Sequence, residues 1–288
     1  MNIAETNKIK FAIPSKGRLK DPAIELLKKA GYKFRASGRN LYATCTNADI
    51  IFIFVRTDDI PILVNSGVCD LGITGQDLVL EHNVAIQEIL PLGFGKCRLC
   101  VAVRDSHENT DLSYFHKKNI ATSFPTMTTD FFKRNNIDIN CIEMSGSVEI
   151  MVGLHLAEAI VDIVETGDSL RDNNLKVLCD IGSYETVLIA SNEKKHNEEI
   201  EKIRRRIEGV IVASQYSLLE YNIPRNKLEQ AEKITPGFES PTVSKLEDSE
   251  WAAVRVMVKK KEVVQAMDEL EELGATAIIE TDISNCRL

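Results

Sequence analysis

The stretch 159–169, Ala-Ile-Val-Asp-Ile-Val-Glu-Thr-Gly-Asp-Ser, decides the fold. Its first six residues are apolar apart from Asp162, which predicts a buried strand that runs into a turn. A turn of small hydroxyl residues around Gly167 can direct successive backbone N–H groups and two hydroxyls at a phosphate. The same residues also suit an ordinary strand-to-helix turn with a hydroxyl cap, so both interpretations stay open at this point.

Strand and helix patterns alternate on both sides of this stretch. Apolar runs at 8–13, 50–55 and 69–74 predict strands, and each is followed by a helical pattern. Helical spacing also predicts a helix over 147–156. The alternation predicts an α/β protein with parallel or mixed sheets that helices cover on both faces.

The last part of the chain has a different pattern. Residues 193–221 predict one long helix, because isoleucines recur on one stripe. An alternating strand at 252–258, an amphipathic helix and a final strand at 276–283 then predict a small β-α-β module with its own core. The predicted domains are a first lobe over 1–92, completed by a return segment at about 184–205, a second lobe over 93–183 and a tail domain over 214–288.

Composition excludes several classes of protein. The chain has 288 residues, 44% of them hydrophobic, and a net charge of −8, so it is not disordered, and a nucleic-acid partner is not expected. No apolar run reaches the ~18–20 residues of a membrane helix, and residues 1–16 lack the apolar core of a secretory signal. The seven scattered cysteines fit reduced thiols, so we expect a cytoplasmic protein that binds small anions.

Cationic residues follow two of the predicted strands. In the segment 14–19, Lys16 and Arg18 flank a glycine directly after the first strand. Arg56 follows the second buried strand at the equivalent edge. Ligands of open α/β sheets bind at the carboxyl ends of strands, so these cations suit a polyphosphate. A solvated loop, and for Arg56 a surface ion pair with a following aspartate, are the alternatives.

Two further segments offer weaker signals. The segment 70–75, Asp-Leu-Gly-Ile-Thr-Gly, suits either a close ligand approach, with Asp70 accepting from ribose hydroxyls, or a tight turn. Cys97 and Cys100 have the spacing of a zinc or redox site, but no second pair follows, so a metal site is not favoured. The sequence also lacks the Walker A, dinucleotide-binding and serine-hydrolase motifs.

Together, these segments resemble the long form of the ATP phosphoribosyltransferase family, whose enzymes catalyse the first step of histidine biosynthesis. The segments that carry the resemblance are 14–19, 56–61, 70–75, 95–99, 145–149, 162–167 and, in the tail, 235–242 and 286–288. The chain departs from the family pattern at Met151-Val152, Glu158, Ser169 and Asn222, where Ala-Pro, Asp, Thr and an acidic residue are usual.

The resemblance implies a fold and a function. The expected fold is a two-lobed core like that of periplasmic binding proteins, plus a small ferredoxin-like or ACT-like regulatory domain. The expected reaction joins C1 of 5-phosphoribosyl 1-pyrophosphate to N1 of ATP and releases pyrophosphate, with Mg²⁺ as cofactor. Histidine, with AMP as a second candidate, is the expected inhibitor of a homo-oligomer built from dimers up to a hexamer. The alternatives are a non-catalytic solute-binding protein and a catalytically inactive regulatory subunit.

The resemblance also assigns residues to sites and leaves the metal ligands unassigned. The cations expected at pyrophosphate or ATP phosphates are Lys16, Arg18 and Arg56. The expected phosphate loop is formed by Glu165, Thr166, Gly167, Asp168 and Ser169. The residues expected near ribose or adenine or along the cleft are Asp70, Gly75, Glu149 and Asp162. The residues expected to hold histidine are Asn222, Phe238, Ser240, Thr242 and the backbone near Ala277.

Overall fold

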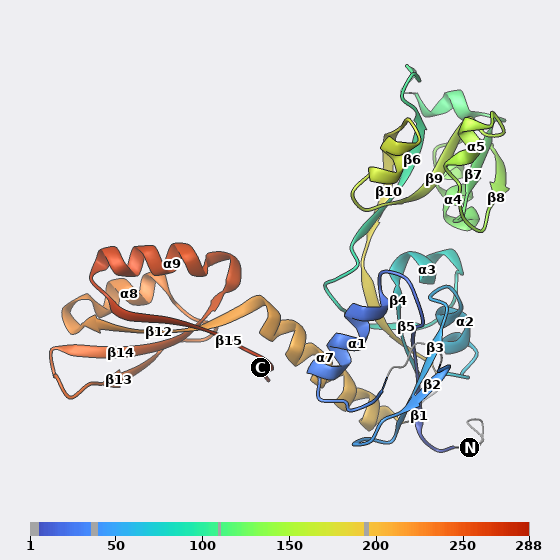
Figure 1. Ribbon diagram of the computed structural model, residues 1–288. Helices are drawn as coiled ribbons and strands as arrows, with labels where there is room; N and C mark the ends of the chain where they lie inside the picture. Colours follow the sequence, from blue (N-terminus) through green and yellow to red (C-terminus); the bar gives the residue numbers. More distant parts are fainter. Residues whose placement is uncertain (1–5, 36–39, 109–110, 193–195, 288) are drawn as a thin grey trace. The chain divides into compact units, whose positions relative to one another are not determined.

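The computed structural model describes residues 6–35, 40–108, 111–192 and 196–287 (Figure 1). The chain divides into two compact units, the first from 1–25 and 33–200 and the second from 26–32 and 201–288. The described residues form three sheets, two in the first unit and one in the second.

The first sheet has the strand order β2-β3-β1-β4-β11-β5. Its strands are β1 (Ile9–Pro14), β2 (Tyr42–Thr44), β3 (Ile50–Val55), β4 (Leu71–Gly75), β5 (Gln87–Pro91) and β11 (Thr186–Ala190). Strands β3 and β4 pair in parallel with β1, whereas β11 returns to the sheet antiparallel to β4. The helices of this part are α1 (Lys20–Lys29), α2 (Asp59–Asn65) and α3 (Gln76–Glu81).

Buried apolar side chains hold this sheet in place. The predicted strands at 8–13 and 50–55 are confirmed as β1 and β3, and their side chains are largely buried because parallel sheets are covered on both faces. The rings of Phe11 and Phe34 lie 5.7 and 4.1 Å from that of Phe52. This core fixes where each strand ends, and so where the loops after the strands lie.

The second sheet has the strand order β10-β6-β9-β7-β8. Its strands are β6 (Cys97–Arg104), β7 (Asn119–Thr122), β8 (Asn140–Glu143), β9 (Ala159–Val164) and β10 (Leu175–Tyr184). Strands β7, β8 and β9 are parallel, and β6 is antiparallel to β9 and β10. Its helices are η2 (Leu112–Phe115), α4 (Pro125–Arg134), α5 (Ile150–Gly153) and α6 (Asp168–Asp172).

The helix predicted over 147–156 is shorter in the structure. Only α5, a single turn, is α-helical there. Ser147 and His155 have φ values of 52° and 58°, in the left-handed region that a right-handed helix excludes. The backbone at these two residues therefore limits the helix on both sides.

The third sheet, in the second unit, has the order β13-β14-β12-β15. Its strands are β12 (Tyr216–Pro224), β13 (Thr242–Lys245), β14 (Trp251–Lys259) and β15 (Thr276–Asp282). Its helices are η3 (Arg225–Lys227), α8 (Leu228–Ile234) and α9 (Lys260–Leu273). Alternate residues of β12 and β14, such as Tyr221 and Val254, are buried with Leu270 of α9 in one core.

The long helix predicted over 193–221 is wrong at its end. Helix α7 covers Asn197–Gln215, and the chain then continues directly as β12; residues 193–195 lie outside the described residues. From Tyr216 onward the burial alternates with a period of two, which favours a strand over a helix. The isoleucine stripe of α7 is confirmed, since Ile203 and Ile207 are buried.

The segment after β15 packs on α7. The backbone N–H of Cys286 donates a hydrogen bond of 3.1 Å to the carbonyl of Gly209. A Cβ at position 209 would overlap the carbonyl oxygen of Cys286, so only glycine fits there without movement. Among the described residues, we find no helix with the length and apolar character needed to cross a membrane.

Replacing Gly209 by alanine will lower the free energy of unfolding. An alanine in place of a helix-interior glycine ordinarily stabilises by ~1 kcal/mol, but here the new methyl group overlaps backbone. Gly153→Ala in α5 is the matched control, because nothing lies within 4 Å of its added Cβ. Urea denaturation measures the free energy of unfolding of both variants. Equal gains in stability for Gly209→Ala and Gly153→Ala would contradict the packing described for Cys286.

Candidate functional site

The predicted cations gather at one edge of the first sheet. Because β1 and β3 are parallel, the loops after Pro14 and Val55 emerge at the same edge. Lys16, Arg18 and Arg56 lie in these loops and are exposed. The structure therefore brings together the three cations that the sequence singled out.

A buried carboxylate lies at this edge, close enough to Arg18 to feel its charge. Gly75 ends β4 at the same edge, and a Cβ on it would overlap the carboxylate of Asp77. Asp77 is only 3% exposed, and its carboxylate accepts a hydrogen bond from the N–H of Leu78. Burial raises the pKa of Asp77, and the charge of Arg18 opposes that rise. The sequence prediction missed Asp77; its signal was an aspartate in the first turn of a helix that follows a strand.

Asp70 does not belong to this edge. It precedes β4, so it lies at the amino end of the strand, whereas Gly75 ends it. Its carboxylate accepts a hydrogen bond of 2.8 Å from the backbone N–H of Lys10, near the start of β1. The expectation that Asp70 lines the same cleft as Gly75 and the cations is therefore corrected, because a five-residue strand separates the two positions.

The turn after β9 has the shape expected of a phosphate loop. Gly167 has a φ of 80° and precedes α6, and its added Cβ would meet nothing nearer than 3.5 Å. The hydroxyl of Thr166 donates a hydrogen bond of 2.6 Å to Asp168, which also pairs with Arg171. These two partners lower the pKa of Asp168, and Arg171 compensates its negative charge beside the turn.

Two carboxylates lie beside this turn. Ser169 donates a hydrogen bond of 2.5 Å to Glu149, which precedes α5, and Ser123 donates one of 3.4 Å to Asp162. Burial raises the pKa of Asp162, and the negative charge of Glu149 raises it further. Loops after the parallel strands β7, β8 and β9 therefore bring Ser123, Glu149 and the turn to one edge of the second sheet.

An ion pair joins the two edges. Nη1 of Arg18 lies 2.6 Å from Oε1 of Glu165 and donates to the carbonyl of Gly95 at 3.2 Å. A cavity of about 450 Å³ lies at this junction. Its lining residues are Gln76, Lys96, Cys97, Arg98, Val164, Glu165, Ser183, Tyr184 and Glu185. Gln76 of α3 and polar groups of the second sheet and its adjoining loops thus face one hollow that is large enough for a small molecule.

Cys97 and Cys100 are buried, free thiols. All seven cysteines lie among the described residues and are free thiols. Burial raises the pKa of Cys100 to about 12, so its thiol keeps its proton, and it donates to Asp180 at 3.2 Å. Within the part of the chain that the structure describes, no three His, Cys, Asp or Glu side chains come together as metal ligands.

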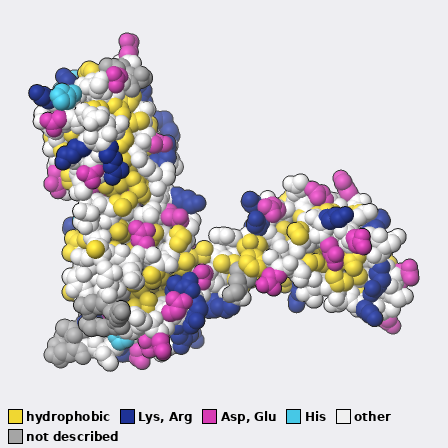
Figure 2. Space-filling model, turned by 180° about the vertical axis from the view of Figure 1, so that it is seen from behind, with side chains coloured by type: hydrophobic (Ala, Val, Ile, Leu, Met, Phe, Trp, Pro, Cys, Tyr) yellow, Lys and Arg dark blue, Asp and Glu magenta, His cyan; other side chains and the backbone are white. Residues whose placement is uncertain are grey.

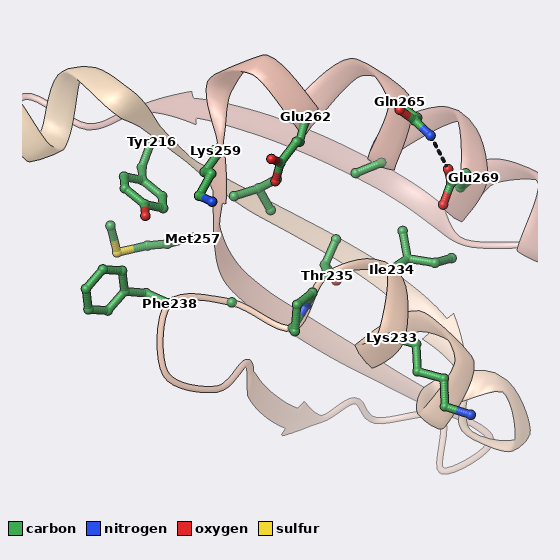
Figure 3. A pocket seen from close by; sticks show the side chains of 14 residues that line it. Tyr216, Lys233, Ile234, Thr235, Phe238, Met257, Lys259, Glu262, Gln265 and Glu269 are labelled. Atoms are coloured by element: carbon green, nitrogen blue, oxygen red, sulfur yellow. Dashed lines mark hydrogen bonds between the residues drawn. The ribbon is translucent and has the colours of Figure 1, made fainter.

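The second unit contains a separate cavity of about 500 Å³ (Figure 3). At one end, the rings of Tyr216 and Phe238 lie edge to face with centroids 5.8 Å apart, and Met257 lies beside them. At the other end, Gln265 of α9 donates a hydrogen bond of 2.8 Å to Glu269. The pocket therefore offers an aromatic end and a polar end.

The residues predicted to hold histidine are spread over this unit. Phe238 lines the cavity, whereas Asn222 alternates with buried Tyr221 and so lies on the sheet face opposite α8 and α9. Ser240, Thr242 and Ala277 are exposed. Ala277 has a φ of 49°, which places its backbone in an unusual conformation within β15. Of these five residues, Phe238 lines the cavity of Figure 3 and the other four do not.

Surface charges do not form a basic area on the face drawn in Figure 2, where blue and magenta side chains are interspersed. Arg204 illustrates this mixing, since it pairs with Glu201 at 2.8 Å and with Glu208 at 3.0 Å on α7. Such a surface does not favour the phosphate backbone of a nucleic acid.

Replacing Asp162 by asparagine will raise stability at neutral pH. Because folding raises the pKa of Asp162, the ionised carboxylate lowers the free energy of unfolding at pH values above the raised pKa. The effect disappears at a pH low enough for Asp162 to be protonated in both the folded and the unfolded state. Asparagine keeps the acceptor for Ser123 and Ile163 without the charge. We expect a gain of about 0.5–2 kcal/mol at pH 7.5 that shrinks towards pH 4. Urea denaturation with EDTA at both pH values measures it; a gain that grows in acid would contradict the assignment.

Comparisons with known proteins agree with this geometry. A family model described as "HisG: ATP phosphoribosyltransferase" matches residues 56–209, and one described as the HisG C-terminal domain matches residues 213–285. An ATP phosphoribosyltransferase of Rhodopirellula baltica is 47% identical over 280 residues, which cover 97% of this chain and 94% of that protein.

Solved structures show the same core. An ATP phosphoribosyl transferase (HisG:HisZ) complex from Thermotoga maritima matches with a TM-score of 0.63 and 30% identity, over 72% of this chain and 98% of that one. The substrate-binding protein of an amino acid ABC transporter matches at 12% identity with a TM-score of 0.50, over 72% and 94%, which shows the fold alone. The predicted α/β class with a binding-protein-like core is thereby confirmed. By family models over both parts and a relative of nearly full length, the chain belongs to the ATP phosphoribosyltransferase family.

Proposed function

We propose that the chain transfers the phosphoribosyl group of 5-phosphoribosyl 1-pyrophosphate to N1 of ATP, releasing pyrophosphate in the first step of histidine biosynthesis. The observation that carries this proposal is the open turn at Gly167, next to an ion pair from the cationic edge. One side offers backbone N–H groups and hydroxyls for a monophosphate. The other offers cations for a polyphosphate. Together these match the two charged ends of the donor.

The residues divide the work of the reaction between them. Backbone N–H groups and hydroxyls of residues 165–169 hold the 5-phosphate, and Glu149 and Asp162 face the ribose hydroxyls. Lys16, Arg18 and Arg56 stabilise the negative charge that builds up on pyrophosphate as the C1–O bond breaks. The sugar then carries oxocarbenium-like charge, and N1 of adenine attacks C1 without a covalent enzyme intermediate.

Mg²⁺ is the cofactor in this proposal. Mg²⁺ prefers oxygen ligands and is commonly held by one or two carboxylates together with substrate phosphates. Glu149 and Asp162 fit that description, because the charge of Glu149 is felt at Asp162 and both carboxylates adjoin the donor turn. When bound, the ion supplies positive charge to the pyrophosphate.

Two alternatives receive less support. A solute-binding protein shares the fold, but a similarity at 12% identity is no evidence for a shared activity. Membership of the ATP phosphoribosyltransferase family does not favour a solute-binding role. An inactive regulatory subunit would not need three exposed cations beside an open phosphate turn. The catalytic proposal uses both features.

Pyrophosphate release tests the function, with Gly167→Val as the diagnostic variant. Release must require the donor, ATP and Mg²⁺ together. At a φ of 80° a β-branched residue is strained, so the turn distorts and kcat/KM for the donor falls at least a hundredfold. Gly31→Val, at a φ of 90°, imposes the same kind of strain away from the turn and keeps donor affinity. Absence of release by the unaltered chain would refute the proposal.

We also propose feedback control at the tail. Histidine, with AMP as a second candidate, is the inhibitor, and the active form is a cytoplasmic homo-oligomer, from dimer to hexamer. The support is a separate module with its own buried core and a cavity that has aromatic and polar ends. Because Asn222, Ser240 and Thr242 do not line that cavity, we propose that a second subunit completes a histidine site that uses all of them.

Asn222→Asp will strengthen histidine inhibition. The ammonium group of histidine gains an ionised partner in place of a neutral carbonyl, which we expect to lower the inhibition constant about three- to tenfold. Asn226→Asp on exposed η3 adds the same charge elsewhere and should change little. Steady-state inhibition curves measure both. An intact enzyme that millimolar histidine leaves uninhibited would leave the tail only a role in assembly.

A further inference from the structure

The ion pair between Arg18 and Glu165 points to a function for the Glu165 side chain. We propose that Glu165 is a positioning residue that holds the Arg18 guanidinium before the donor binds. The pyrophosphate group of the donor displaces the Glu165 carboxylate from Arg18, and the ion pair forms again as pyrophosphate leaves. This inference rests on the proposed function, since it deepens the role of the same site.

The Arg18 guanidinium is held from two sides. Nη1 lies 2.6 Å from Glu165 and 3.2 Å from the carbonyl of Gly95. The Gly95 acceptor is a main-chain carbonyl, and the neighbouring carbonyl of Phe94 accepts a hydrogen bond of 3.1 Å from the backbone N–H of Thr186 in β11. The acceptor is therefore tied to the first sheet through the main chain, whereas Glu165 is a side chain that can change rotamer.

The other negative group near Arg18 cannot take part in an exchange. Asp77 is buried at 3% exposure, and its carboxylate is tied to the N–H of Leu78. Asp77 is therefore not available to exchange with an anion from solvent. Glu165 is 46% exposed and Arg18 is 33% exposed, so an anion from solvent can reach both.

A phosphate oxygen can replace the carboxylate with little loss. Arginine binds carboxylate and phosphate through the same N–H donors. Half-exposed ion pairs are weak, so the exchange has a small net cost. A guanidinium without Glu165 would bind both substrate and released pyrophosphate more tightly. The carboxylate thus limits ground-state binding and speeds release of the product.

The test is Glu165→Gln in the full-length protein, which keeps the shape of the side chain and removes its charge. Calorimetric titration with inorganic pyrophosphate and Mg²⁺ should give a Kd three- to tenfold lower than in the unaltered protein. Donor kinetics should show KM and kcat falling together, because release becomes slower. Glu165→Asp retains the charge and should restore the parent Kd at least in part.

A double-mutant cycle with Arg18→Gln separates the ion pair from a general effect of charge. If Glu165 acts through Arg18, then Glu165→Gln changes the pyrophosphate Kd less than twofold when Arg18 is already glutamine. An equal gain in that background, or weaker binding by Glu165→Gln alone with circular dichroism unchanged, would overturn the inference. Failure of the proposed function looks different, because the unaltered protein would then bind neither pyrophosphate nor the donor.

Discussion

Parallel strand pairing is the constraint on which the site depends. Strands β1, β3 and β4 run in one direction, and so do β7, β8 and β9, so each set delivers its following loops to one edge of its sheet. The buried cores between the sheets and their helices fix those strand ends. Residues that are far apart in sequence, such as Arg18 and Glu165, therefore come within ion-pair distance without any single strong local interaction.

The two edges carry complementary chemistry. The first presents cations and a buried carboxylate, and the second presents a glycine turn with carboxylates beside it. A donor with a monophosphate at one end and a pyrophosphate at the other matches this division. Burial, and in addition the charge of Glu149, raises the pKa of Asp162, so an ionised carboxylate at this edge costs stability that a neutral residue would not.

The sequence predicted much of this site, because apolar runs locate strands and the residues after strand ends locate loops. Lys16, Arg18, Arg56 and Gly167 were expected in loops after strands for that reason, and the structure places them there. Asp70 was misplaced because its position at the start or end of β4 depends on strand boundaries, which a pattern of six residues does not define. Strand β12 was missed because α7 runs directly into it, with no glycine or proline between Ile211 and Tyr216 to mark the end of the helix. Of the five residues predicted to hold histidine, Phe238 lines the cavity of the second unit and the others do not, because the sequence pattern did not define which sheet face or loop each of them occupies.

Hydrogen exchange of the backbone amides tests most directly whether the two edges form one site. The full-length protein is compared with and without 5-phosphoribosyl 1-pyrophosphate and Mg²⁺. Our account predicts slower exchange in two segments together, residues 165–169 after β9 and residues 15–18 after β1. Slower exchange in only one of these segments, or only in the tail, would contradict it.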